Sequence, residues 1–435
     1  MKRYHFFIAI LLICAALSSC MDDRLSAPSE SISSEAGSSD EIQSASESSI
    51  DEDYIEDPLF ETEEYLEDYD HNNHYTNIAK AVVATEDSVY YIKPLVADQD
   101  KYLYYYDRKT CVSDVLCTNP ECMHQDKNCK GYIGHTQPGL FLYDNKLYWI
   151  GSIPDPAGKA TSVWALLRCS LDGSDRETVL LIDRDMYYYY QPQEFFLHRG
   201  YLYFVGEAHT VSAAGEAEQL ISVIGLSLKE NGKAITVFEK KYPGSVNRPH
   251  LFFAGNKIYY HHGRTDSGGT EYEICCYSIR TRKTETIFEG YFDGPVRPEC
   301  GESAFWIEDG EIYALFNSLG SDPVSQVKKL NQGKWEDVYI PKQPTTMRIY
   351  AGKLTSEEES EDGNGKWTIN IRELDGRPVY KGEKPEIPNL IGFMVSGGNS
   401  SEMFYSAFRH IGARAFMSLY RIDIRNQTPP EIIIE

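Results

Sequence analysis

A short phrase that recurs along the chain constrains the fold more than any other feature. In Gly139–Gly151 two apolar stretches flank a polar turn, and the second stretch reads Leu-Tyr-Trp. Equivalent stretches recur, the first five at intervals of roughly 55 residues, which is close to the repeat length of propeller blades. They lie at 89–91, 147–149, 202–204, 258–260, 312–314 and 403–405. Gly, Asn or Asp precedes most of them, and these residues tolerate the positive φ of tight hairpins. The phrase therefore predicts a repeated β-hairpin.

Each hairpin is followed by a longer polar segment and then by a second hairpin, so each unit has four strands. One example of this second hairpin begins with Val163–Leu171 and turns at 172–174. The strands are rich in β-branched and aromatic residues and carry few helix signals. Four-stranded units that pack around an axis bury both faces and leave only short edges. The sequence predicts an all-β fold, a β-propeller over residues 79–435, rather than a parallel β-helix, whose repeats are shorter.

The number of blades depends on the stretch between Ile312 and Met403. These residues are 91 positions apart, too far for one unit and too close for two full ones. Within this interval Ile369-Asn370-Ile371 is typical of the third strand of a shortened unit. We therefore predict seven blades of four strands, with six blades as the alternative.

The N-terminal 20 residues have the layout of an export signal. Met1-Lys2-Arg3 is charged, and Phe6–Ala16 is apolar but too short for a typical membrane span. Leu17-Ser18-Ser19-Cys20 then resembles a bacterial lipobox, in which the cysteine becomes lipid-modified after cleavage. The resemblance implies an extracytoplasmic protein whose Cys20 carries a lipid such as palmitate in the outer leaflet of the cytoplasmic membrane. An ordinary secretory signal with an incidental cysteine is the alternative.

Residues 21–78 are predicted to form a disordered acidic tether. Met21–Asp70 contains 18 acidic residues and one basic residue, which accounts for most of the net charge of −24. A segment rich in Ser, Glu and Asp cannot bury enough apolar surface to offset its chain entropy, and like charges extend it. Aromatic and leucine residues between Tyr54 and Tyr69 indicate a weakly docked linker, or alternatively a partner-binding peptide. The remainder is mildly acidic without a basic patch, which argues against non-specific nucleic-acid binding.

A cysteine-rich insertion, residues 111–134, follows the first unit. It begins at Cys111 and contains Cys117, Cys122, His124 and Cys129. Three thiolates and one imidazole would complete a closed tetrahedral zinc site of the structural type. An exported protein ordinarily favours disulfides, and the four cysteines allow two bridges in three pairings. Both alternatives stay open, with free thiols as a third, and as a metal site or a disulfide loop the insertion is predicted to staple a loop.

The long connections are predicted to carry the function. In propellers the loops between strands two and three and those between blades emerge on one face, here called the long-loop face, whereas tight turns lie on the other. Binding residues are frequently found on loops that a rigid scaffold holds in place. Polar tips on aromatic bodies suit sugar or peptide recognition. The candidate ligand-binding residues on this face are Tyr188, Tyr190, His209, His261, His262, Arg264, Arg409 and His410.

No catalytic motif stands out in the sequence. There is no G-x-S-x-G, no H-E-x-x-H and no phosphate-binding loop. The leading hypothesis is a surface-anchored, non-catalytic propeller that binds a protein or glycan. The alternatives are an extracellular glycan-active hydrolase or lyase, and a scaffold for envelope protein assembly.

The repeats and the cysteine loop together resemble a family of uncharacterised lipoproteins of Gram-positive anaerobes. Their propeller is similar to the YWTD-type propeller of low-density lipoprotein receptors and to a related domain of unknown function. The resemblance rests on the [DGN]-x-[LIV]-Y-[YWF] phrase and on a loop after the first unit that contains Cys117, Pro120, Cys122, His124 and Cys129. Leu147-Tyr148-Trp149-Ile150 lacks the Thr-Asp of the YWTD phrase, so calcium and receptor-ligand properties are not implied.

Overall fold

The chain divides into two units, residues 1–51 and residues 52–435. A computed structural model describes parts of the second unit only. The described residues are 58–70, 82–92, 101–124, 128–134, 136–183, 186, 194–211, 215, 217–243, 246–265, 268–319, 323–359, 366–411 and 414–435. The predicted export signal and Cys20 therefore lie outside them. No helix within the described residues is long and apolar enough to span a membrane.

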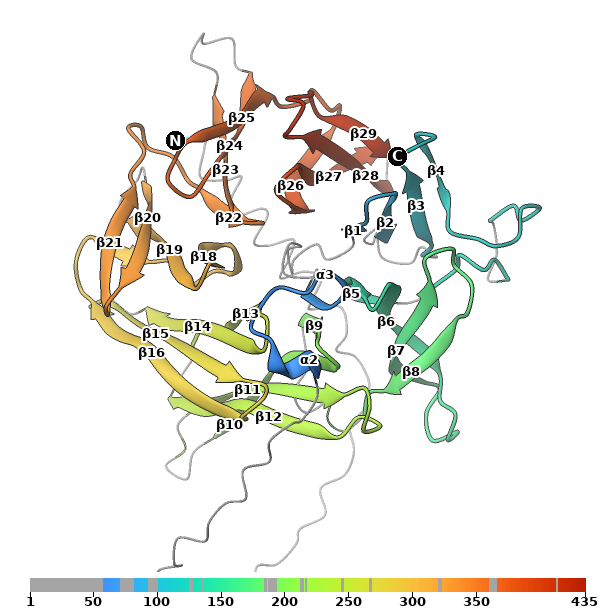
Figure 1. The fold of residues 1–435 in the computed structure, drawn as a ribbon, viewed down its shortest axis with the longest axis horizontal. Coiled ribbons are helices and arrows are strands. Elements are labelled where there is room, and N and C mark those ends of the chain that lie inside the picture. Colours follow the sequence, from blue (N-terminus) through green and yellow to red (C-terminus); the bar gives the residue numbers. More distant parts are fainter. Residues whose placement is uncertain are drawn as a thin grey trace, which may run out of the picture. The chain divides into compact units, whose positions relative to one another are not determined.

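Seven antiparallel sheets follow one another around a ring, so the prediction of seven blades is confirmed (Figure 1). Blades one to three are β1 (Val82–Ala84), β2 (Ser88–Ile92), β3 (Leu103–Asp107), β4 (Val112–Val115); β5 (Thr136–Tyr143), β6 (Lys146–Pro154), β7 (Ser162–Ser170), β8 (Glu177–Leu181); and β9 (Glu194–His198), β10 (Tyr201–Val211), β11 (Ala217–Ser227), β12 (Ala234–Pro243). Blade four is β13 (His250–Ala254), β14 (Lys257–Thr265), β15 (Thr270–Ser278) and β16 (Lys283–Phe292). In each of these blades the strands pair in chain order.

Blades five to seven keep the plan, with one variation. Blade five has five strands, because β17 (Val296–Pro298) and β18 (Phe305–Glu308) both pair with β19 (Glu311–Ser318), which is followed by β20 (Ser325–Asn331) and β21 (Lys334–Tyr339). The short 3-10 helix η2 (Glu302–Ala304) separates β17 from β18. Blades six and seven are β22 (Arg348–Tyr350), β23 (Lys353–Glu359), β24 (Trp367–Arg372), β25 (Pro378–Glu383); and β26 (Leu390–Gly398), β27 (Glu402–Ile411), β28 (Arg414–Asp423), β29 (Glu431–Ile434). The predicted third strand at 369–371 is β24.

The turn of the recurring phrase has the backbone that its residues favour. Asp144 and Asn145, between β5 and β6, have φ of 47° and 54°. Two successive residues with positive φ match the twist of the flanking strands in a two-residue hairpin. The same role falls to Arg199 and Gly200 between β9 and β10, with φ of 38° and 80°. These turns align the first two strands of each blade.

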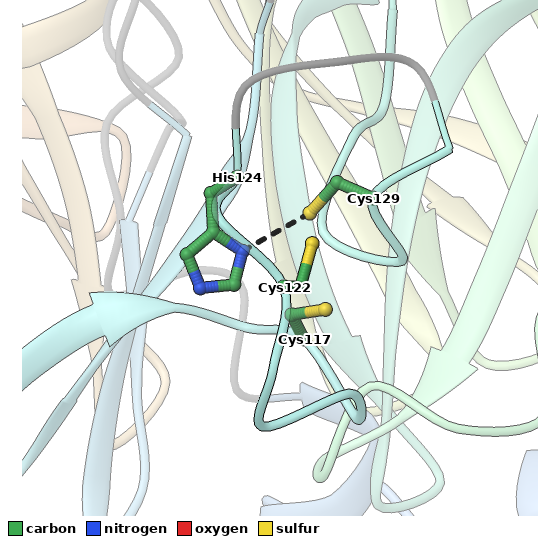
Figure 2. A group of neighbouring side chains, drawn as sticks. All are labelled: Cys117, Cys122, His124 and Cys129. Atoms are coloured by element: carbon green, nitrogen blue, oxygen red, sulfur yellow. Dashed lines mark hydrogen bonds between the residues drawn. The ribbon is translucent and has the colours of Figure 1, made fainter.

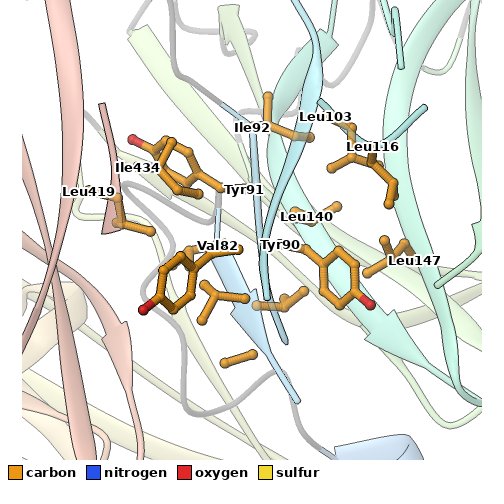
Figure 3. Packing of buried hydrophobic residues seen from close by; sticks show 14 of the residues in the cluster. Val82, Tyr90, Tyr91, Ile92, Leu103, Leu116, Leu140, Leu147, Leu419 and Ile434 are labelled. Carbon is orange, nitrogen blue, oxygen red and sulfur yellow. The ribbon is translucent and has the colours of Figure 1, made fainter. Parts of the chain in front are cut away.

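The ring closes by side-chain packing between blade seven and blade one, because each of these blades takes all four strands from one continuous segment. Val82 and Tyr91 of blade one belong to the same buried cluster as Leu419 and Ile434 of blade seven (Figure 3). Leu147 of blade two also belongs to it. The first and last blades are thus joined through one hydrophobic core.

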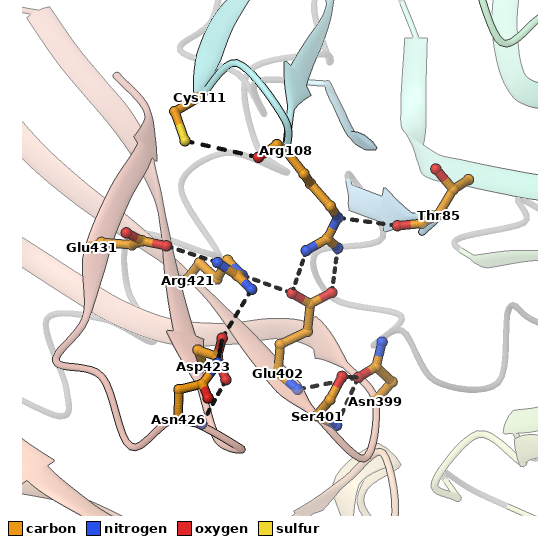
Figure 4. Close-up of polar contacts among 10 residues, drawn as sticks. All are labelled: Thr85, Arg108, Cys111, Asn399, Ser401, Glu402, Arg421, Asp423, Asn426 and Glu431. Carbon is orange, nitrogen blue, oxygen red and sulfur yellow. Dashed lines mark hydrogen bonds and ion pairs between the residues drawn. The ribbon is translucent and has the colours of Figure 1, made fainter. Parts of the chain in front are cut away.

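A buried carboxylate reinforces this closure (Figure 4). Glu402 begins β27, and its side chain is only 4% exposed. Arg108, from the β3–β4 turn, binds both carboxylate oxygens and also donates from Nε to the Thr85 carbonyl at 3.1 Å. Arg421, from β28, donates to Glu402 Oε2 at 2.7 Å and to Glu431 Oε1 at 2.9 Å. Two arginines from different blades therefore share one acid across the junction.

Residues 58–70, called the strap below, are docked on the hairpin-turn side of blades two to four. They form the short helices α2 (Pro58–Glu61) and α3 (Glu67–Asp70). Arg199 is fully buried and donates to both carboxylate oxygens of Asp70, at 2.9 and 2.6 Å. Its guanidinium also donates to three strap carbonyls, those of Leu59, Thr62 and Glu64. All five donors of one arginine are thereby satisfied by the strap.

The strap also lies against blades three and four through apolar and backbone contacts. Phe60 is buried in a core cluster with Tyr201 and Phe253, and its carbonyl accepts a hydrogen bond from Asn256 Nδ2 at 2.9 Å. Gly255 has φ +56°, and an added Cβ would lie 2.2 Å from the Glu63 carbonyl oxygen, so glycine is needed there. The structure thus differs from the expectation of a disordered or weakly docked segment at 58–70, because a buried ion pair and a buried aromatic ring hold these residues.

Candidate functional site

Strand alternation brings six side chains of blade four to one face of its sheet. The β14–β15 ladder sets His262 opposite Glu273 and Arg264 opposite Glu271. The β15–β16 ladder then sets Glu289 opposite Glu273. Because side chains two positions apart in a strand share a face, these residues project together. The six are His262, Arg264, Glu271, Glu273, Glu289 and Tyr291.

These side chains line a pocket of about 520 Å³ between blades three and four. Its other wall includes Lys240 and Tyr242 of β12 and the buried Val246. The pocket is formed by the ends of β12, β14 and β16 and the start of β15. Those ends lead into connections between strands two and three or between blades, so the pocket lies on the predicted long-loop face. Its size falls within the roughly 300–1,000 Å³ of typical small-molecule sites.

A histidine–carboxylate pair lies in this pocket. His262 Nε2 is 3.1 Å from Glu273 Oε2, and the imidazole is only 8% exposed. The Tyr242 hydroxyl lies 3.4 Å from His262 Nε2 and 3.5 Å from Nδ1, and the two rings meet edge-on. Lys240 Nζ, from the neighbouring blade, is 3.3 Å from Glu273 Oε2. The hydrogen bond from His262 holds the pKa of Glu273 down to about 2, assisted by Cys275 and Lys240 and opposed by burial. Glu273 is therefore an anion that fixes His262 and Lys240.

The rim of the pocket is more open than this polar network. Tyr291 is 55% exposed, and Arg264, Glu271 and Glu289 are also exposed. Within the described part of the chain, no residue forms an ion pair with the Arg264 guanidinium. The rim thus offers one aromatic surface, one cation and two carboxylates to a ligand.

The structure brings two of the eight candidate ligand-binding residues, His262 and Arg264, into one pocket. His261 is buried instead, stacked on Phe305 at 4.7 Å and 3.2 Å from the Tyr272 hydroxyl, because alternation turns it to the opposite face from His262. Burial lowers the pKa of His261 well below its ordinary value. Its place is a core position between blades four and five rather than a ligand-facing one.

The remaining candidates do not join this pocket. His209 is exposed on β10, 2.9 Å from Glu207 Oε1. Arg409 donates to Glu435 Oε1 at 2.8 Å, which ties β27 to the last residue of the chain. His410 lies in β27, and its side chain is outside the described residues, as are Tyr188 and Tyr190. The expected loop positions are wrong for six candidates, because the ladders of β10, β14 and β27 extend through them: His209, His261, His262, Arg264, Arg409 and His410.

Sequence reasoning missed most of the residues that line the pocket, namely Lys240, Tyr242, Glu271, Glu273, Glu289 and Tyr291. The alternation of Glu271 and Glu273 around the buried Tyr272 was a readable signal that two acids share a face. The contribution of β12 has no such signal, since it depends on how blade three packs on blade four.

The cysteine-rich connection between blades one and two gathers a second group of side chains. One ligand atom from each of Cys117, Cys122, His124 and Cys129 lies within 4.8 Å of all the others (Figure 2). His124 Nδ1 is 3.2 Å from Cys129 Sγ, which also accepts a hydrogen bond from the Gly131 amide at 3.3 Å. Burial raises the pKa of Cys129 to about 11. Burial also raises the pKa of Cys117, but backbone hydrogen bonds at Asn119 and Lys130 lower it, and the pKa is below its ordinary value.

This group could hold a metal ion. In a tetrahedral site with Zn–S bonds of about 2.3 Å, sulfur atoms are roughly 3.8 Å apart. The ligand atoms would therefore have to move by about 1 Å to coordinate a cation. Cys111 is not part of the group. It lies in the β3–β4 turn with φ 56°, and its thiol donates to the Arg108 carbonyl at 3.8 Å. Three clustered cysteines without Cys111 do not form the two bridges of the disulfide alternative.

The comparisons with known proteins concern the fold. No protein-family model matches the chain, and no curated protein sequence matches it. Among solved structures, it is similar to an ulvan lyase, a polysaccharide lyase, at 9% identity with a TM-score of 0.46, covering 83% of this chain and 98% of the lyase. It is also similar to a puromycin-hydrolysing peptidase of Mycobacterium tuberculosis, at 11% identity with a TM-score of 0.48, covering 85% of this chain and 55% of the peptidase.

A third structure is the β-propeller domain of the Trilobed protease of Pyrococcus furiosus, at 11% identity with a TM-score of 0.42, covering 83% of this chain and 98% of that domain. The chain is thus a seven-bladed β-propeller distantly similar to lyase and peptidase propeller domains. At these identities the likeness extends to the fold and not to activity or ligand.

Proposed function

We propose that this protein is a surface-anchored lipoprotein whose propeller binds a glycan at its long-loop face and does not catalyse a reaction of that glycan. The observation that carries the proposal is the pocket between blades three and four. It combines an exposed tyrosine ring, an exposed arginine and carboxylate acceptors over a rigid polar floor. Sugars present apolar faces that stack on aromatic rings and hydroxyls that bond to charged groups.

The arrangement of His262 favours binding over catalysis. Both of its nitrogens lie within 3.5 Å of Glu273 or Tyr242, and the imidazole is almost fully buried. A general base must lie within hydrogen-bond reach of the proton that it abstracts, and these neighbours occupy that position. The rim residues Tyr291 and Arg264 remain accessible to a ligand, so they are the proposed recognition residues.

The test is binding of the purified protein to arrays of cell-wall and plant oligosaccharides, followed by calorimetry with the best ligand. We expect Tyr291→Ala and Arg264→Ala each to weaken binding at least tenfold without lowering the melting temperature. Arg377→Ala is the matched control, because Arg377 is an exposed arginine on the hairpin-turn side with only a 3.9 Å contact to Asp375. Equal affinity of all three variants would contradict the assignment of the pocket.

A glycan-active enzyme is the second candidate, and the His262–Glu273 pair beside Tyr242 is the observation that favours it. Here Tyr242 and His262 would be the proton-transfer groups, with Lys240 offsetting negative charge. The same oligosaccharides, incubated with the protein and analysed for new reducing ends or unsaturated products, distinguish the candidates. Turnover that is lost in His262→Gln would replace the binding proposal with this one. Co-purification of envelope proteins without any glycan ligand would instead support the scaffold alternative.

We also propose that Cys117, Cys122, His124 and Cys129 hold a structural zinc ion. Three thiolates and one imidazole are the ligands of a closed zinc site, and four protein ligands leave no position for substrate. Zinc would fix the connection between blades one and two. Native mass spectrometry with thiol counting tests this: one zinc per chain is expected, and a protein without zinc that is two hydrogens lighter per bridge would show disulfides instead.

The proposed lipid anchor and family rest on sequence resemblance. Cys20 completes the lipobox-like Leu17-Ser18-Ser19-Cys20, and the recurring phrase resembles that of uncharacterised YWTD-like propeller lipoproteins of Gram-positive anaerobes. We expect the mature protein to begin at Cys20 with diacylglycerol and to fractionate with membranes. Cys20→Ala should release it, and an unlipidated wild-type protein in the medium would contradict the proposal.

A further inference from the structure

A half-buried arginine beside the cysteine group has two buried donors without hydrogen-bond partners among the described residues. Arg176 ends the β7–β8 turn of blade two, and its Nη1 donates to the Tyr132 carbonyl at 2.8 Å. The guanidinium lies over the Trp149 ring, 5.2 Å from its centroid. Its Nε and Nη2 are buried and have no hydrogen-bond partner in the described part of the chain. Leaving two buried donors of a cation without partners costs free energy, which a negatively charged neighbour would offset.

The cysteine group is the nearby source of negative charge. Burial lowers the pKa of Arg176, and charge on Cys169, Cys129 and Cys117 acts in the opposite direction. Of these three, Cys169 is fully buried in β7 and is not part of the metal-binding group. Within the metal-binding group, Cys117 and Cys129 act on Arg176, and the Tyr132 amide, next to the carbonyl that Arg176 binds, donates to the Cys129 carbonyl at 3.0 Å.

The charge state of that group depends on what it holds. A divalent ion with three thiolates and a neutral imidazole has a net charge of about −1, which one guanidinium neutralises. A disulfide is neutral, as are protonated thiols, and either would leave the Arg176 charge without a negative partner. The metal-bound state is thus the one in which Arg176 has a partner.

A carboxylate lies near the far side of the histidine. His124 Nδ1 points to Cys129 Sγ at 3.2 Å, whereas Nε2 lies 3.8 Å from Asp114 Oδ1 in β4. Metal-bound histidines ordinarily donate their second N–H to a carboxylate or carbonyl, which orients the ring. The expected coordinating atom is accordingly Nδ1, with Asp114 as the orienting group.

We propose that Arg176 is the counter-charge of a zinc–thiolate centre at Cys117, Cys122, His124 and Cys129, so that the loop favours the metal over disulfides. The inference rests on the proposed zinc site and adds Arg176 as a positioning residue from the next blade. Through Arg176, metal binding would join the cysteine-rich connection to the β7–β8 hairpin.

The experiment compares Arg176→Met with wild type in zinc-loaded and zinc-free full-length protein under reducing conditions. Methionine keeps the packing on Trp149 and removes the charge. Chelator competition should show a 10- to 100-fold loss of zinc affinity, the usual scale for outer-sphere groups. The melting temperature of the zinc-loaded form should fall, whereas that of the zinc-free form should stay unchanged or rise, because an uncompensated buried charge has been removed.

Arg168→Met is the matched control. Arg168 precedes the same turn, lies over the Tyr148 ring and hydrogen-bonds its hydroxyl, and its ion pair is with Glu177 rather than with the cysteine group. It should change both melting temperatures equally and leave zinc affinity within about twofold. Arg176→Lys keeps the charge and should retain most of the affinity, which provides a readout if Arg176→Met does not fold.

The outcomes separate the two proposals. A wild-type protein that binds no zinc overturns the zinc site and this inference with it. A wild-type protein that binds zinc with the same affinity as Arg176→Met overturns only the role of Arg176. Equal destabilisation of the zinc-loaded and zinc-free forms by Arg176→Met would likewise show that Arg176 is a packing residue.

Discussion

The strap provides the sharpest stability prediction. Asp70→Asn keeps the size of the side chain but removes the only carboxylate that the structure places on Arg199. Both side chains are 0% exposed. Removing one partner of a buried ion pair leaves an uncompensated charge, which costs about 3–5 kcal/mol. Arg199 retains its hydrogen bonds to three strap carbonyls, which partly compensate its charge. We therefore expect the free energy of unfolding to fall by about 3 kcal/mol.

Urea unfolding followed by tryptophan fluorescence measures the effect, together with limited proteolysis of the strap. The matched control is Glu63→Gln, which removes an exposed strap carboxylate 3.1 Å from Lys257 Nζ. Exposed pairs contribute at most about 1 kcal/mol, so the control should unfold close to wild type. An Asp70→Asn protein with the urea midpoint and strap protection of wild type would refute the reasoning, since Arg199 could not then depend on Asp70.

Three further predictions concern the closure of the ring, the pH dependence of stability and a glycine that contacts the strap. Glu402→Gln should lower the free energy of unfolding by about 3 kcal/mol, because Arg108 and Arg421 both lose their shared acid. Amide hydrogen exchange should then increase first in β1 and β29. Unchanged exchange in these two strands would contradict a role of Glu402 in closing the ring. Burial lowers the pKa of both His198 and His250 to about 4, so the unfolded state binds more protons between about pH 4 and 6.5. Stability should fall as pH decreases through that window, by up to about 3 kcal/mol for each histidine, and His250→Gln should flatten the slope measured by urea titration. Gly255→Ala should lower the free energy of unfolding by about 1–3 kcal/mol, because the φ of Gly255 is +56° and the added Cβ would meet the Glu63 backbone. Thermal melting measures this loss. The control is Gly294→Ala, where an added Cβ meets nothing within 4 Å.

The sequence allowed the blades to be predicted because their signal is local. A two-residue turn with positive φ at Asp144-Asn145 and alternating apolar side chains suffice to define a hairpin, and copies of it define the ring. The shortened sixth unit was recognised from Ile369 and Ile371, which are fully buried in β24. These properties need no knowledge of distant neighbours.

The site depends on contacts that no local pattern contains. His261 and His262 are adjacent and chemically alike, yet the register of β14 buries the first against Phe305 and turns the second to the pocket. Arg199 sits within an ordinary turn sequence, and only the docked strap reveals why it is buried. The acidic composition around the strap predicts disorder, because composition cannot show that one aspartate and one phenylalanine of this segment are buried.

Hydrogen–deuterium exchange with and without the oligosaccharide selected on the array tests the central claim, recognition at the pocket between blades three and four. The account predicts slower exchange at the pocket ends of β12, β14, β15 and β16, with no change at the turns that hold the strap. Protection confined to the strap, or to the separate groove beside Trp367 between blades six and seven, would contradict it.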